Sequence, residues 1–116
     1  MNKLKIVISL QQVLDGFAGD AELMKGFYNI YKKNYFTRMI DIEKSFESLD
    51  FDSIYRTVHT LKGSILNFNI PEFSEIAKGY ELVAKGRNIE EIKDKYTKFK
   101  EACDLLMALL DEKIQD

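Results

Sequence analysis

His59, the only histidine in this sequence, is the side chain best suited to nucleophilic chemistry. An imidazole with an ordinary pKa of about 6.5 is largely unprotonated at neutral pH, so it attacks without the help of a base. Lys62 and Gly63 follow three and four residues later, and in a helix all three positions share one surface. A phosphoryl group on the imidazole would bring negative charge that the Lys62 ammonium could offset.

The apolar residues around His59 predict the direction in which it points. At about 100° per residue, five apolar positions lie within roughly 40° of Ile54, whereas His59 points roughly 140° away from the middle of this stripe. The five positions are Ile54, Val58, Leu61, Ile65 and Phe68. We therefore predict an exposed histidine in the middle of a helix, and a surface histidine without a role remains the alternative.

Gly63 costs the helix about 1 kcal/mol relative to alanine, and we interpret it as space cleared for a partner beside His59. Close helix packing is the other explanation, but Gly63 points roughly 180° from the apolar stripe. Tyr55 and Leu66 fall on the same side of the helix as His59 and extend its surface with apolar side chains. These residues together suit a nucleophile that another protein must reach.

Stop and start signals divide the chain into four longer helices and one short one. Asp20 is predicted to cap a helix over 20–49, Asp52 caps the next helix to 67–69, and Pro71 opens a third that ends at Gly86. Asn88, with Glu91 three positions later, is predicted to cap the last helix. A short helix over 9–14 precedes them and stops at Gly16.

The apolar spacing within these helices predicts an all-α fold. The apolar positions of the first long helix are Leu23, Phe27, Ile30, Tyr31, Met39, Ile42, Phe46 and Leu49, and those of the last are Ile92, Tyr96, Phe99, Cys103, Leu106 and Leu110. Short connections favour an up-and-down antiparallel four-helix bundle with a short extra N-terminal helix. We expect one domain over 1–116, with an arm and short helix over 1–19 and the bundle over 20–116.

Composition excludes several classes of function. Lys and Arg number 17 against 19 Asp and Glu, for a formal net charge of −2, whereas a nucleic-acid binder needs a concentrated basic surface. One cysteine and one histidine cannot build a disulfide within the chain or a zinc site, so we expect no metal. The apolar run at 6–8 is too short for a membrane span or signal segment. We expect a cytoplasmic monomer without nucleic acid or membrane.

The segment from His59 to Ser64, His-Thr-Leu-Lys-Gly-Ser, resembles the signature of histidine phosphotransfer (HPt) domains of two-component phosphorelays. Downstream, Ala77 followed by Tyr80-Glu81 and then Gly86 is similar to the Ala-x-x-Leu-Glu string and helix-ending glycine of that family. The likeness covers roughly residues 23–110. It departs from the family at Leu66, which is bulkier than expected, and at Tyr80 and Asn69, which stand where leucine and glycine are usual.

The resemblance implies a phosphocarrier. His59 would accept a phosphoryl group through Nε2 from a receiver-domain aspartate and pass it to another receiver, Lys62 would support the phosphate, and Gly63 would let the receiver dock. The partner would be the receiver domain of a response regulator or of a hybrid sensor histidine kinase. That receiver would supply Mg²⁺, so the chain itself would need no cofactor and would have no autokinase activity.

Two other classes of function remain open from the sequence. A helical adaptor would bind a partner through the same face without phosphotransfer, and a small enzyme would use His59 as a general base, although no second catalytic group accompanies it. Phe36 and Ile40 lie off the main apolar stripe, and we expect them either to be buried or to extend a partner-docking surface around His59. Gly79 has no role that the sequence explains.

Overall fold

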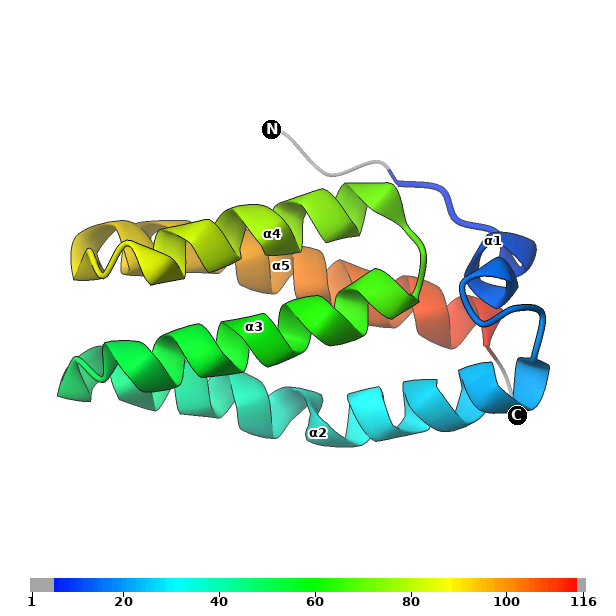
Figure 1. The fold of residues 1–116 in the computed structure, drawn as a ribbon, viewed down its shortest axis with the longest axis horizontal. Helices are drawn as coiled ribbons and strands as arrows, with labels where there is room; N and C mark the ends of the chain where they lie inside the picture. The colour runs from blue at the N-terminus through cyan, green and yellow to red at the C-terminus, as the bar shows by residue number, and fades with distance from the viewer. Residues whose placement is uncertain (1–5, 115–116) are drawn as a thin grey trace.

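The computed structural model describes residues 6–114 and contains five α-helices but no β-strand within that range. The helices are α1 (Leu10–Asp15), α2 (Ala21–Ser48), α3 (Phe51–Asn67), α4 (Pro71–Lys85) and α5 (Ile89–Lys113). The four long helices run in alternating directions, and α1 lies across one end of them (Figure 1). Contacts join α2 to α3, α3 to α4, α4 to α5 and α5 to α2, which closes the predicted four-helix bundle. The fold prediction is confirmed.

Side-chain caps start most of the helices. Ser9, Asp20 and Asn88 each accept a hydrogen bond from a backbone N–H of the first turn of α1, α2 and α5, as predicted for Asp20 and Asn88. The cap of α3 was predicted wrongly, because Asp50 rather than Asp52 accepts from the N–H of Ser53. Both aspartates suit an N-cap, and because the helix begins two residues earlier than predicted, the Asp52 side chain can pair with Arg87 in the connection between α4 and α5.

Residues with positive φ end several helices. Asn69, which stands where the family usually has glycine, adopts φ 61° after α3, because asparagine tolerates the left-handed conformation. At the end of α4, however, Gly86 keeps a right-handed conformation and Arg87 takes φ 56°. The Arg87 guanidinium is held there by Asp52 and lies over the Phe51 ring, so long-range contacts compensate a conformation that glycine would adopt without strain.

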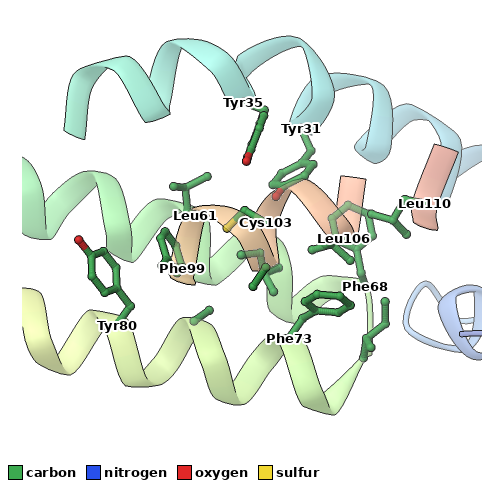
Figure 2. Close-up of a cluster of buried hydrophobic side chains, with 14 of the residues drawn as sticks. Tyr31, Tyr35, Leu61, Phe68, Phe73, Tyr80, Phe99, Cys103, Leu106 and Leu110 are labelled. Carbon is green, nitrogen blue, oxygen red and sulfur yellow. The ribbon is translucent and has the colours of Figure 1, made fainter. Parts of the chain in front are cut away.

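The apolar core runs along the inside of the bundle, with Phe68 fully buried near one end among four other aromatic rings (Figure 2). On α3 and α5 the buried positions match the predicted stripes. On α2 the prediction was partly wrong, because Leu23, Ile30 and Leu49 are exposed. Their places in the core are taken by Met24, Tyr28 and Tyr35.

The tyrosines of α2 explain this difference. Tyr28 and Tyr35 bury their rings and donate their hydroxyl hydrogens to Asp111 and Asp104 on α5, which satisfies the polar end of each side chain. Tyr28 and Tyr35 therefore join the predicted Tyr31, Met39 and Ile42 in the core face of α2, where Leu23 and Ile30 were expected. No helix among the described residues is long and apolar enough to cross a membrane.

Candidate functional site

Helix α3 holds His59 out of the core, as predicted. Val58 and Leu61 on either side of it are fully buried, whereas 57% of the His59 side chain is exposed. A Cβ placed on Gly63 would meet no atom within 4 Å, so this glycine is not required for helix packing. The structure therefore favours the interpretation that Gly63 leaves open surface one turn from the imidazole.

A carboxylate that was not predicted as a site residue completes the arrangement. Glu81 on α4 contacts the imidazole of His59, with 2.5 Å between Oε2 and Nδ1, and its other oxygen lies 3.3 Å from the Nζ of Lys62. Only 16% of the Glu81 side chain is exposed. One carboxylate from the neighbouring helix thus binds both His59 and Lys62, the two residues of α3 that were predicted to take part in the chemistry.

The charge of Glu81 determines which imidazole nitrogen is free. Burial by itself would raise the pKa of the Glu81 carboxyl, but hydrogen bonds from His59 and Lys62 outweigh it and lower that pKa below its ordinary range. An ionised carboxylate only accepts hydrogen bonds, so Nδ1 must carry the proton. The lone pair of the neutral ring therefore lies on Nε2, to which no described residue makes a hydrogen bond.

The face of the imidazole is also restrained. The ring of Tyr55, one turn earlier on α3, stacks on it with the centroids 5.8 Å apart and the planes inclined by 22°. Tyr55 is half-buried and Leu66 is 37% exposed. The structure therefore brings Tyr55, His59, Lys62, Gly63 and Leu66 to one side of α3, as the helical spacing predicted.

Phe36 and Ile40 do not join this surface. Phe36 is 71% exposed and Ile40 is 50% exposed, so the expectation that they are buried was wrong. Lys32, one turn before Phe36, pairs with a carboxylate on α5, and Glu43, three residues after Ile40, accepts a hydrogen bond from a tyrosine on α5. These neighbours place the two residues on the side of α2 next to α5. His59 lies on the side of α3 next to α4, so Phe36 and Ile40 do not extend the surface around it.

Two other features lie outside the site. A groove of about 690 Å³ lies on the surface between α4 and α5, and Gly79 is among its lining residues. Nothing in the structure explains why this position is a glycine. Cys103 is buried in the core, and burial raises the pKa of its thiol, as expected of a core cysteine. Within residues 6–114, no three histidine, cysteine or carboxylate side chains form a group that could hold a metal ion.

The signal for Glu81 was present in the sequence only as part of the family resemblance. Glu81 lies 22 residues from His59, and no helical spacing connects positions on different helices. Periodicity predicts which face of α4 is apolar, but not which residue of α3 that face opposes. The pairing required the antiparallel packing of α3 against α4 (Figure 1).

A comparison with protein-family models matches residues 27–113 to the Hpt domain, which confirms the resemblance seen in the residues around His59. Comparisons with characterised proteins and with solved structures gave no match. The family match covers most of the chain and all of α3 and α4, the two helices that build the site. The chain therefore belongs to the Hpt domain family, whose members carry out phosphotransfer in two-component phosphorelays.

Proposed function

We propose that this chain carries phosphate between receiver domains on Nε2 of His59. The observation that carries the proposal is the contact between Nδ1 and the Glu81 carboxylate, because it leaves the nucleophilic lone pair on Nε2 of an exposed imidazole. The open surface at Gly63 gives a receiver room to approach that nitrogen.

In the transfer step, the Nε2 lone pair attacks the phosphorus of a receiver aspartyl phosphate. An N–P bond forms as the bond between phosphorus and the aspartate oxygen breaks, and the aspartate leaves as a carboxylate with the bonding electron pair. The proton stays on Nδ1, so the ring gains positive charge that the neighbouring Glu81 carboxylate stabilises. The reverse of this step delivers the phosphoryl group to a second receiver aspartate.

Lys62 supports the phosphoryl group in this proposal. Its ammonium lies against Glu81, and 21% of its side chain is exposed, so it can reach the outer surface without leaving the site. The receiver supplies Mg²⁺ and most of the stabilisation of the transition state, and this chain supplies the positioned nucleophile.

Phosphoryl transfer to His59→Gln tests the proposal. A receiver domain is charged with acetyl phosphate in Mg²⁺, desalted, and mixed with the wild-type chain or with the variant, and the products are measured by mass spectrometry under alkaline conditions. We expect one phosphate on the wild type, lost in acid, and none on the variant. Phosphate that persists on His59→Gln would refute the proposal. Full receiver binding without any phosphate on the wild type would instead support an adaptor.

A further inference from the structure

The register between α3 and α4 places two lysines of α4 around His59. The ion pairs of Glu81 with His59 and of Arg87 with Asp52 fix this antiparallel register. Lys78 lies three residues before Glu81 and Lys85 lies four residues after it, so both share its face of α4. Continuing the register places these lysines on either side of the His59–Glu81 pair.

The positive charge of these lysines is not balanced locally. The carboxylate of Glu81 is already bound by His59 and Lys62. Lys78 approaches only Glu75, at 4.0 Å, and the Glu75 side chain is 77% exposed, so that pair is weak. Lys85 makes no ion pair within residues 6–114. Lys78 and Lys85 therefore add positive charge near His59 although the whole chain carries a net charge of −2.

Exposed apolar side chains accompany the lysines. Leu82, the residue after Glu81, is 69% exposed, and across the helix pair Leu66 and Tyr55 are partly exposed on α3. An apolar centre with a charged rim is the usual composition of a transient protein interface. The basic rim favours a partner whose contacting surface is acidic.

We infer that the outer side of α4, with Lys78 and Lys85, forms part of the docking surface for the receiver and fits an acidic rim around its phosphoaspartate. The inference rests on the proposed function, because that function makes an aspartyl phosphate the group delivered to His59. The two lysines attract and orient the anionic partner and do not touch the reacting atoms. The face of α2 with Phe36 and Ile40 is not part of this docking surface.

Local stability offers another explanation for the same lysines. Lys85 lies in the last turn of α4, where a cation stabilises the helix dipole, and Lys78 approaches Glu75 on its own helix. Both of these effects change the stability of the free chain. Neither changes how receiver affinity depends on salt, so a salt titration separates them from a docking role.

The test measures the Kd of the receiver domain used in the phosphotransfer assay, at ionic strengths from about 20 to 300 mM. The double variant Lys78→Ala/Lys85→Ala is compared with Lys93→Ala/Lys98→Ala, which removes the same charge from exposed positions on α5. Both pairs are placed in the wild-type chain and in His59→Gln, so that binding is scored whether or not phosphate is transferred. Thermal unfolding is recorded for every variant.

We expect the α4 pair to weaken binding about three- to tenfold at low salt and by less than twofold at high salt, while the α5 pair has little effect. The inference would be overturned if the α4 double variant bound the receiver with the affinity and salt dependence of the wild type. It would also be overturned if the α4 and α5 double variants had the same Kd for the receiver. The absence of any receiver binding would overturn it as well. Normal binding without phosphate transfer would refute the proposed function alone.

Discussion

Replacing Glu81 with glutamine tests the central feature of the site. The variant keeps the size and hydrogen-bonding oxygen of the side chain but removes the charge that binds His59 and Lys62. Without that charge, the proton of the imidazole is no longer fixed on Nδ1, and the positive charge that the ring gains during transfer is no longer offset. We expect slower phosphoryl transfer with an intact fold.

The magnitude follows from the strength of the contact between Glu81 and His59. A hydrogen bond to a charged group contributes about 1.5–3 kcal/mol, and the contact joins the 16% exposed Glu81 to a His59 side chain that is 57% exposed. At about 1.4 kcal/mol per tenfold change, the loss corresponds to a rate roughly 10- to 100-fold slower. Glu75→Gln is the matched control, because Glu75 is exposed on the same helix and approaches only Lys78. We expect less than a twofold effect there.

Two measurements check this prediction. The second-order rate of transfer from a phosphorylated receiver gives the kinetic effect, and ¹⁵N NMR of the imidazole gives the position of its proton. In the neutral ring of the wild type the Nδ1–H form should predominate, because the ionised Glu81 carboxylate accepts that proton, and in Glu81→Gln the Nε2–H form should gain population. A variant with wild-type transfer rate and an unchanged tautomer ratio would refute the assigned role of Glu81.

Two further predictions concern Gly63, on the helix that carries His59, and the tyrosines of the core. Gly63→Ala should raise the free energy of unfolding by about 0.5–1 kcal/mol, because no atom lies within 4 Å of the added Cβ. Gly63→Glu should keep the helical circular dichroism but slow phosphoryl transfer, because the longer side chain obstructs the receiver. Unaltered transfer in Gly63→Glu would contradict the docking role of this position. Burial raises the pKa of five tyrosines above the ordinary value of 10.0, so the folded state holds these protons more tightly than the unfolded state. Stability from them is fully present below pH 10 and is lost as pH rises through their folded pKa values, which denaturant titrations with tyrosinate absorbance will show; a free energy of unfolding that stays constant above pH 10 would contradict this. The five are Tyr28, Tyr31, Tyr35, Tyr80 and Tyr96.

Local sequence signals were sufficient for most helix boundaries. Asp20, Pro71 and Asn88 act within one turn of their own position, so their effect does not depend on the rest of the fold. These local signals did not predict the exact boundary where two neighbouring residues were equally suited to cap or end the helix. Asp50 and Asp52 both suit an N-cap, and Gly86 and Arg87 both follow α4. Arg87, in the connection after α4, pairs with Asp52 on α3, and no local rule contains such a long-range contact.

Burial on α2 shows a second limit of the sequence. Leu23 and Ile30 are more apolar than Tyr28 and Tyr35, so a hydrophobic pattern favours the wrong face of the helix. The tyrosines are buried because carboxylates on α5 accept their hydroxyl hydrogens. Those partners lie 69 to 83 residues away along the chain, and their distance in space is set only when the bundle closes.

The sequence by itself determined that His59 is exposed and that Lys62 and Gly63 share its surface, because the turn of one helix fixes the directions of residues three and four apart. Tertiary structure alone decided that Glu81 binds both His59 and Lys62, because this contact depends on the register of α4 against α3. The same packing separated Phe36 from the site. Helical spacing predicts the direction in which Phe36 points from the axis of α2, but it does not predict which neighbouring helix lies in that direction. Chemistry within one helix follows from spacing, and chemistry between helices follows from packing.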